Sequence, residues 1–298
     1  NTTMGNAGIF VGSLYKSSNV FINISGCMND GFVSGGSYVG GYIGEILRSK
    51  NVNVTISESM NNGVVAGTND VGGFIGRICG NDNIWTLFRD DQSNGTVTGN
   101  GQANYVGGFV GHVWDNRNMT MQMDDIVNYG KLSESKSVGG FFGCIEYNTD
   151  VNLSISKSVN NGIINGSDMT GGFIGVFRDN KNVDVSMLKC LSNGIVNGSG
   201  NEVGGFFGTI NTGTNTITLS DCVNNGTVNG SGNEVGGFVG KINSGINTIT
   251  LSDCVNNGTV TTKSENAGGF FGTIDNTQNT TIMVSNGINH GSVTSDSE

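Results

Sequence analysis

The stretch Val203-Gly204-Gly205-Phe206-Phe207-Gly208, which reads VGGFFG, decides the fold of this chain. Glycine lowers the stability of a strand and aromatic residues favour strands, so the two halves of the string make opposite demands on the backbone. Related strings occur nine times in the 298 residues. The repetition indicates that contacts with neighbouring copies make up for the stability that glycine takes from a single strand.

The repeat has two anchors that keep step along the whole chain. The first is the motif aromatic, which recurs at intervals of 32 to 35 residues, and the second is a turn glycine that recurs from Gly31 to Gly291. One three-residue insertion falls near Asn100–Ala103. Residues 1–298 are therefore a single tandem array of nine units. The aromatics, which we expect to stack as a core ladder, are Phe10, Tyr42, Phe74, Phe109, Phe141, Phe173, Phe206, Phe238 and Phe270.

Each unit contains three segments with the period-two alternation of strands, such as Gly226–Val228, Val235–Ile242 and Thr216–Ser220. We predict an all-β parallel β-solenoid of about nine coils of ~32 residues, with three short strands per coil. A propeller is the alternative, but its blades need about 40–50 residues and four strands. The absence of proline favours the solenoid, because strand N–H groups must pair with the next coil. Nine coils give a rod on the order of 43 Å long.

The composition excludes two classes of partner. The chain has 51 Gly, no Pro and 13% charged residues, with a net charge of −10. This acidic balance argues against nucleic acid. No apolar run approaches the length of a membrane span, so we expect no membrane insertion.

The repeated core resembles a known class of repeats. Two glycines, two hydrophobic residues and a third glycine, preceded by Asn-Gly-Thr-Val, are similar to the GLUG motif of large secreted and surface-anchored proteins. The resemblance covers all nine units, although an aromatic usually stands here where that family commonly has Leu. It implies an extracellular, adhesin-like or wall-associated repeat region and brings no catalytic residues.

Two positions that follow the aromatic in each unit raise the question of which way their side chains point. The position three residues after it reads Ser13, Glu45, Arg77, His112, Cys144, Val176, Thr209, Lys241 and Thr273, so we expect this face to lie mostly in solvent. The position directly after the aromatic is apolar throughout. A glycine bulge turns it into the core, or it forms a lateral interface between rods. The candidates for that interface are Ile43, Ile75, Phe142, Phe207 and Phe271.

Four cysteines occupy one column, four residues before the turn glycine: Cys27, Cys190, Cys222 and Cys254. Their spacing comes from the repeat and favours small stacked core residues over a disulfide framework or a zinc site. Disulfides between neighbouring coils stay open where thiols adjoin. Cys79 and Cys144 lie in other columns and have no evident partner.

Asparagine is abundant in the turns and in glycosylation triplets. Pairs such as Asn224/Asn225 are expected to stack as amide ladders. The best N-glycosylation candidates lie on the outward face of the third strand or just before it. They are Asn23, Asn53, Asn118 and Asn152.

The sequence offers little for catalysis, and we predict no enzyme and no cofactor. The two histidines, His112 and His290, lie about five coils apart. Trp85 and Trp114 are candidates for stacking on a sugar ring, with core or edge packing as the other interpretation. An outward column of acidic residues is a candidate for calcium binding through its oxygen atoms. The favoured interpretation is a charged edge that lies in solvent. Its members are Glu58, Asp90, Asp125, Asp221 and Asp253.

The two ends of the array carry no sign of a cap. Joining Gly291–Glu298 to Asn1–Gly12 of another copy would complete a further junction of the repeat. We therefore expect end-to-end self-association or a longer chain of like repeats. The function expected is a non-enzymatic extracellular or cell-surface rod in a filament, stalk or coat. The alternative is an adhesin segment that binds carbohydrate or a cell-surface receptor.

Overall fold

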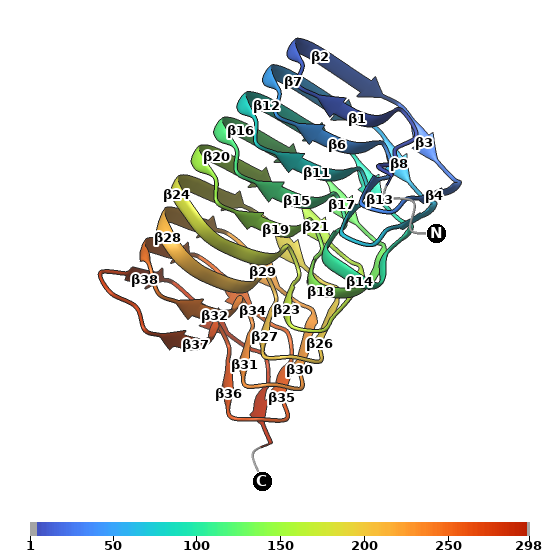
Figure 1. The fold of residues 1–298 in the computed structure, drawn as a ribbon. Helices are drawn as coiled ribbons and strands as arrows, with labels where there is room; N and C mark the ends of the chain where they lie inside the picture. Colours follow the sequence, from blue (N-terminus) through green and yellow to red (C-terminus); the bar gives the residue numbers. More distant parts are fainter. Residues whose placement is uncertain (1–4, 297–298) are drawn as a thin grey trace.

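The chain folds as a parallel β-solenoid of about nine coils, stacked in chain order from the blue to the red end of Figure 1. This computed structural model describes residues 5–296, apart from the side chains of residues 101–103 and 134. Every strand pairing in it is parallel, and partners lie about one repeat apart, as in Val11 with Ile43. The predicted fold class is confirmed.

The largest sheet has 16 strands and folds back on itself as two arms. The first arm contains β1 (Val11–Tyr15), β6 (Ile43–Leu47), β11 (Ile75–Cys79), β15 (Val110–Trp114), β19 (Phe142–Glu146), β32 (Val239–Asn243) and β37 (Phe271–Asp275). The second arm contains β2 (Ser18–Ser25), β7 (Lys50–Ser57), β12 (Asp82–Arg89), β16 (Arg117–Asp124), β20 (Thr149–Ser156), β33 (Ile246–Ser252) and β38 (Thr281–Ser285). Two long strands run through both arms: β24 (Ile174–Leu188) and β28 (Phe207–Ser220).

A second sheet of 15 strands lines a smaller lobe in two rows. The row after the turn glycine contains β4 (Phe32–Ser34), β9 (Val64–Ala66), β22 (Ile163–Gly166), β26 (Ile195–Gly198), β30 (Thr227–Gly230), β35 (Val260–Thr262) and β40 (Val293–Ser295). The row before the motif aromatic contains β5 (Tyr38–Gly40), β10 (Asp70–Gly72), β23 (Met169–Gly171), β27 (Glu202–Gly204), β31 (Glu234–Gly236) and β36 (Asn266–Gly268). Both rows include β14 (Thr96–Gly107) and β18 (Lys131–Gly139), whose register shifts between Thr98 and Ala103 at the predicted insertion.

The third sheet consists of nine two-residue strands that the sequence analysis missed. They are β3 (Met28–Asn29), β8 (Met60–Asn61), β13 (Gln92–Ser93), β17 (Val127–Asn128), β21 (Val159–Asn160), β25 (Leu191–Ser192), β29 (Val223–Asn224), β34 (Val255–Asn256) and β39 (Ile288–Asn289). The predicted second strand is also broken: in Val235–Ile242, β31 ends at Gly236 and β32 begins at Val239. Most coils therefore contain five strand segments rather than three, because the chain bends at the motif.

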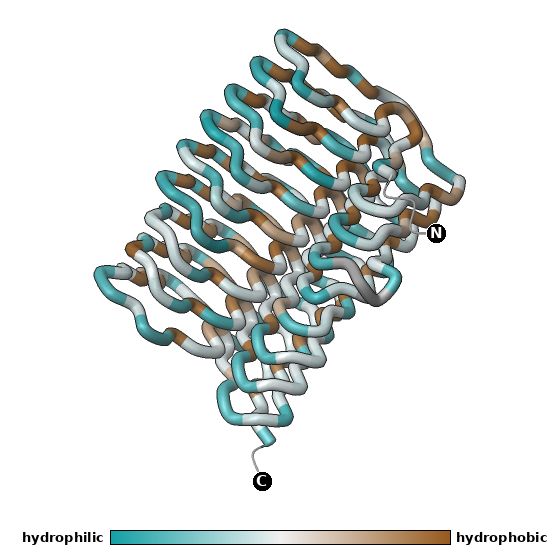
Figure 2. The backbone as a smooth tube through the Cα atoms, viewed as in Figure 1, coloured by the Kyte–Doolittle hydropathy of each residue, from teal (hydrophilic) through white to brown (hydrophobic). Residues whose placement is uncertain are grey.

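Two separate cores run along the solenoid. The large lobe, between the two arms, holds the aromatics together with the Ile, Leu, Met and Val side chains of both arms. The valine lobe, between the two rows of the second sheet, holds residues such as Val203 and Val228. Figure 2 shows the corresponding hydrophobic stripes passing from coil to coil.

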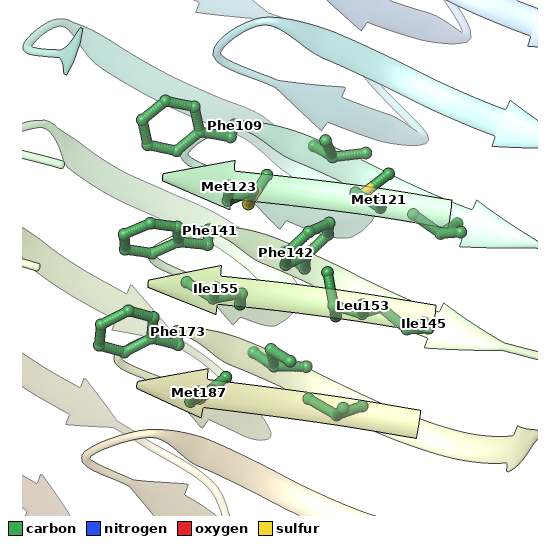
Figure 3. Packing of buried hydrophobic residues seen from close by; sticks show 14 of the residues in the cluster. Phe109, Met121, Met123, Phe141, Phe142, Ile145, Leu153, Ile155, Phe173 and Met187 are labelled. Atoms are coloured by element: carbon green, nitrogen blue, oxygen red, sulfur yellow. The ribbon is translucent and has the colours of Figure 1, made fainter. Parts of the chain in front are cut away.

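The motif aromatics form a continuous stack inside the large lobe. Phe141, Phe173, Phe206 and Phe238 are fully buried, and successive ring centroids lie 4.4–4.8 Å apart at interplanar angles of 4–13°. Figure 3 shows this ladder from Phe109 to Phe173, with an aliphatic and methionine column beside it. Stacking of this kind adds to the burial of each ring, and it is the contact that one copy of the motif obtains from the next.

The glycines of the motif are required by close backbone approach. A Cβ atom at Gly204 would overlap the carbonyl oxygen of Phe207, and one at Gly205 would overlap that of Gly237 in the following coil. A side chain at either place would force the bend or the coils apart. Glycine is thus the residue that lets the chain turn next to the ladder.

Amide ladders are observed in the turns. Asn224 Nδ2 donates to Asn256 Oδ1 at 2.7 Å in the interior, while Asn225 Nδ2 donates to Asn193 Oδ1 at 2.9 Å on the surface. A further buried ladder joins Asn116, Asn148 and Asn180 near the bend between the two arms. Each amide supplies both a donor and an acceptor, so neighbouring amides can pair from coil to coil. The interior ladder is interrupted at Ser93 and Ser192, and next to these serines Asn61 Nδ2 and Asn160 Nδ2 are left without a partner.

Candidate functional site

The most chemically varied part of the molecule is the inner corner, where the first arm of the large lobe meets the valine lobe. Two columns face each other there. One comes from the first arm, and the other is the residue before the core valine of each coil, or before Thr170 in the coil of Met169. The first column runs Glu45, Arg77, His112, Cys144, Val176, Thr209 and Lys241; the second runs Tyr38, Asp70, Tyr105, Ser137, Met169, Glu202 and Glu234.

The prediction that the first of these columns lies mostly in solvent is wrong. Glu45, Arg77 and His112 are only 3%, 8% and 5% exposed, and Cys144 is completely buried. The reason is the valine lobe, which folds against this face of the first arm. Alternation in the short strands of that lobe turns one residue, the valine, into its own core and the preceding residue toward the first arm.

Arg77 lies between two aromatic rings in the inner corner. Its guanidinium carbon is 4.4 Å from the ring centroid of Tyr38 and 4.5 Å from that of Trp114, which places the cation on both faces. Its Nη2 donates to Cys79 Sγ at 3.0 Å. Burial raises the pKa of the Cys79 thiol, although the Arg77 charge opposes this shift. Arg77 thus covers the face of Trp114 that it touches.

His112 lies between two carboxylates. Its Nδ1 is 3.1 Å from Asp70 Oδ2, and its Nε2 is 3.2 Å from Glu146 Oε1. Burial acts to lower the pKa of His112, but the carboxylates of Asp70 and Glu146 outweigh it and raise the pKa above its usual value. The imidazole ring also contacts the Tyr105 ring, at 4.4 Å between centroids.

Glu146 is held by a second cation on its far side. Arg178 Nε lies 2.5 Å from Glu146 Oε2, and Arg178 Nη2 donates to the Tyr105 hydroxyl at 3.0 Å. Burial acts to raise the pKa of Glu146, but His112 and Arg178 lower it below its usual value. Asp70, His112, Glu146 and Arg178 therefore form one chain of alternating acidic and basic side chains across four strands, β10, β15, β19 and β24.

Cys144 lies directly below His112 and begins an apolar patch. It packs with Met169, Val176 and Tyr105 in a small cluster separate from the two main cores. Complete burial raises the pKa of its thiol well above the usual value. An unassisted Cys144 is thus a neutral thiol and a poor nucleophile.

A cavity of about 240 Å³ opens onto this cluster. Its walls include Tyr38, Asp70, Tyr105, His112, Trp114 and Glu146. The cavity therefore combines aromatic rings with both signs of charge. Beyond the apolar patch, the inner corner becomes charged again where Lys241 Nζ lies 3.0 Å from Glu234 Oε1.

The two predicted stacking tryptophans lie in different environments. Trp85 is half-buried on the outer face of β12, between Asn53 and Thr120 of the neighbouring strands. Trp114 is half-buried in the inner corner, on the other arm. The structure does not bring the two rings into one site, and Trp114 alone belongs to the cavity.

The lateral interface considered in the sequence analysis is not formed, because its residues point inward. Ile43, Ile75, Phe142 and Phe207 are fully buried in the large lobe, and Phe271 packs against the same core in the last coil. The inward alternative holds because the chain bends at the glycine pair, so that two successive motif residues enter one core.

The other predicted surface residues take ordinary positions. Of the glycosylation candidates, Asn23, Asn118 and Asn152 are exposed and Asn53 is half-buried. All six cysteines are free thiols, and Cys190, Cys222 and Cys254 stack as a buried column whose Cys222 thiol has a pKa raised to about 12, chiefly by Cys190.

The acidic column lies at an exposed corner of the coil in the left-handed backbone conformation. Its φ values run from 53° at Glu58 to 56° at Asp125. Across the described part of the chain, these carboxylates do not form a converging group of three metal-ligating side chains. The one group that does is His112, Cys144 and Glu146.

Sequence reasoning missed the inner corner for an identifiable reason. The column of the motif aromatics keeps one chemical type through all coils, whereas the column of His112 changes from acid to base, thiol, apolar residue and hydroxyl. That variation looks like an exposed face. Only the packing of the valine lobe against it shows that the varied residues are buried together.

Comparisons with known proteins add no family. No family model, no curated protein and no solved structure matches this chain. Within residues 5–296, no helical segment has the length and apolar character that crossing a bilayer requires.

Proposed function

We propose that this chain is a non-enzymatic structural rod whose end coils stack on like coils, of the same chain or of another copy. The supporting observation is that columns buried inside the solenoid are exposed at its ends. Phe10 is 50% exposed in the first coil, whereas Tyr42, its equivalent in the second coil, is completely buried. Ile274 is 48% exposed in the last coil, whereas Ile242 is completely buried.

The backbone of the end coils supports the same proposal. Among the described residues, β1, β2, β3 and β4 pair only with the second coil, and β37, β38, β39 and β40 pair only with the coil before them. Each end therefore presents a row of strand edges, the kind of surface on which another strand adds readily. Figure 1 shows both edges open.

Covering the apolar side chains at the end of the rod would contribute favourable free energy to stacking. Ile274, Val284 and Val293 are about half exposed, and their equivalents one coil earlier are completely buried. Full burial of such a side chain contributes about 1.5–3 kcal/mol, so covering these three contributes on the order of 3 kcal/mol. The new backbone pairings add to that.

An extracellular or cell-surface setting belongs to the proposal. The resemblance of the repeat to GLUG-type regions supports it, as do exposed glycosylation triplets such as that of Asn152. In that setting the rod would serve a filament, stalk or coat.

The test is assembly of the purified chain as its concentration is raised, followed by sedimentation and electron microscopy. We expect linear oligomers whose width equals that of one coil. Val284→Lys should abolish them, because it places a charge on the stacking face. The matched control is Leu188→Lys, which adds the same charge at a 43% exposed position in the middle of the rod. A chain that stays monomeric at every concentration overturns the proposal.

An adhesin segment that binds carbohydrate is the second candidate, and the aromatic and charged cavity at Trp114 supports it. Binding of the chain to a glycan array, lost in Trp114→Ala and kept in Trp85→Ala, would favour this function. Equal binding by both variants would argue against the cavity as the glycan site.

A further inference from the structure

Three side chains with metal-binding atoms converge in the inner corner. His112 is on β15, and Cys144 and Glu146 are on the neighbouring β19, where His112 pairs with Cys144 and Trp114 pairs with Glu146. Alternate residues of a strand share a face, so Cys144 and Glu146 point to the same side as His112. One ligand atom from each of the three lies within 4.8 Å of the others, and all three residues are buried.

The separation of the nitrogen and oxygen ligands fits an ion between them. His112 Nε2 and Glu146 Oε1 are 3.2 Å apart, yet within the described residues this contact lacks the geometry of a hydrogen bond. A tetrahedral zinc ion with bonds of 2.0–2.1 Å keeps two such ligands about 3.3 Å apart. The buried Nε2 is thus already at ligand distance from a carboxylate oxygen without a good hydrogen bond to it.

Asp70 supplies an independent indication on the other side of the ring. Its Oδ2 lies 3.1 Å from His112 Nδ1. A carboxylate that accepts the Nδ1 proton fixes the tautomer in which Nε2 carries a lone pair, and metal-binding histidines are commonly oriented in this way. Asp70 is itself held near Arg77, whose Nε lies 3.8 Å away.

We propose that His112 Nε2, Cys144 Sγ and Glu146 Oε1 bind one zinc-class divalent ion, with Asp70 as the residue that orients the imidazole. The mixed nitrogen, thiolate and carboxylate set favours zinc, whereas calcium and magnesium prefer oxygen ligands alone. This inference concerns a site within one molecule, and it stands or falls independently of stacking at the ends of the rod.

The ligand atoms bind a metal ion only when they carry no proton. A divalent ion needs a thiolate at Cys144 and an unprotonated Nε2 at His112, so its binding releases protons. Arg178 lies 2.5 Å from Glu146 Oε2, whereas Oε1 accepts one long hydrogen bond, at 3.4 Å from the Tyr105 hydroxyl, and keeps a lone pair for the ion.

Three protein ligands leave a fourth position on a tetrahedral ion. His112 and Glu146 line the cavity of about 240 Å³, whereas Cys144 lies behind them in the apolar patch. The fourth position therefore faces the cavity. Zinc sites with three protein ligands and an accessible position bind water or a small polar ligand there, whereas purely structural sites are closed by four.

The first experiment uses cobalt(II) as a spectroscopic probe in the full chain. After treatment with a chelator and its removal, we expect one equivalent of Co²⁺ to give a near-ultraviolet thiolate-to-cobalt band, and Zn²⁺ to displace it. Absence of a thiolate band at saturating Co²⁺ overturns the proposal and leaves an ion-pair network only. This result needs no variant, so it does not depend on a substituted protein folding.

Variants then assign the ligands. Cys144→Ser should remove the band and weaken Zn²⁺ binding at least tenfold, measured by competition with a chromophoric chelator. Cys222→Ser is the matched control, because it removes another fully buried thiol far from His112 and should keep both the band and the affinity. The opposite pattern, with the band lost in Cys222→Ser and kept in Cys144→Ser, would overturn the assignment.

The orienting role of Asp70 has its own readout. Asp70→Asn should keep the thiolate band while weakening Zn²⁺ binding by about 10–100-fold, the usual effect of losing such a partner. Circular dichroism and the melting temperature establish that each variant is folded. An Asp70→Asn protein with unchanged affinity would exclude Asp70 from the site.

Discussion

The aromatic ladder and the inner-corner column lie three residues apart in every coil, and both are buried through most of the rod. The ladder keeps one chemistry: Phe141, Phe173 and Phe206 repeat the same ring on the same neighbours. The inner corner changes with each coil, from Cys144 to Val176 to Thr209. The two regions lie on the same coils. A ladder residue has the same kind of residue above and below it, whereas an inner-corner residue does not.

The difference teaches where this solenoid has room for individual chemistry. A ladder residue is packed by the coils above and below, so any change of shape is felt by both neighbours. An inner-corner residue instead meets a partner from the valine lobe of its own or an adjacent coil, as Lys241 meets Glu234. Pairs of residues can therefore change together there while the stack stays intact.

Removing a ladder ring should have the largest effect on stability. We expect Phe173→Ala to lower the free energy of unfolding by about 3–5 kcal/mol, because it leaves a cavity between two stacked rings. Phe10→Ala, in the same column but 50% exposed in the first coil, is the matched control and should cost far less. Equal losses in chemical denaturation would contradict the view that contacts from both sides make the ladder.

Much of the fold was open to prediction from sequence because the ladder is so regular. The period of the motif predicted the solenoid. The alternation around Val228 and Leu219 predicted that those side chains are buried, and the structure confirms it. The two-residue strands such as Val223–Asn224 were missed, because two residues are too few to show a period.

The candidate site was hidden for the opposite reason. His112, Cys144 and Glu146 form no local motif: Cys144 and Glu146 are two residues apart, but His112 comes from the preceding coil. Asp70 comes from a different lobe, and its approach to His112 depends on the angle between the lobes. Such a contact follows from packing, which neither spacing nor composition expresses.

Asp91 shows that variation in a buried column has a measurable cost. It is fully buried where other coils have Ser59 or Cys190, and burial raises its pKa to about 7 although backbone N–H groups of Ser59 and Arg89 oppose this. The folded protein therefore holds this proton more tightly than the unfolded chain, whose pKa is near 3.9. Stability should fall as the pH rises from about 4 to about 7, by up to about 4 kcal/mol.

Asp91→Ser removes the buried charge and restores the residue found one coil away. At pH 8 we expect the variant to be more stable than the parent by about 2–4 kcal/mol, with the gain disappearing near pH 4. Melting temperatures of both proteins across this range are the measurement. Ser59→Ala, in the same column but without a titrating group, should shift stability equally at all pH values. Parallel profiles for Asp91→Ser and the parent would contradict the raised pKa.

The exposed corner gives the smallest effect and a gain rather than a loss. Lys157 has a φ of 50°, in the column where the first coil has Gly26 at 61°. A side chain in this left-handed region costs about 1 kcal/mol that glycine avoids. We expect Lys157→Gly to raise the free energy of unfolding by up to about 1 kcal/mol in chemical denaturation.

Lys131→Gly is the control for that gain, because Lys131 is exposed on β18 and φ there is not positive. Glycine should destabilise that strand by about 0.5–1 kcal/mol. Opposite signs for the two substitutions would separate the backbone effect from the loss of a lysine charge, which both share. Lys157→Gly also removes an exposed contact at 3.8 Å with Asp124 Oδ1, and such a pair contributes only about 0–1 kcal/mol. If both variants lose stability, the side chain of Lys157 does not strain the left-handed backbone at this corner.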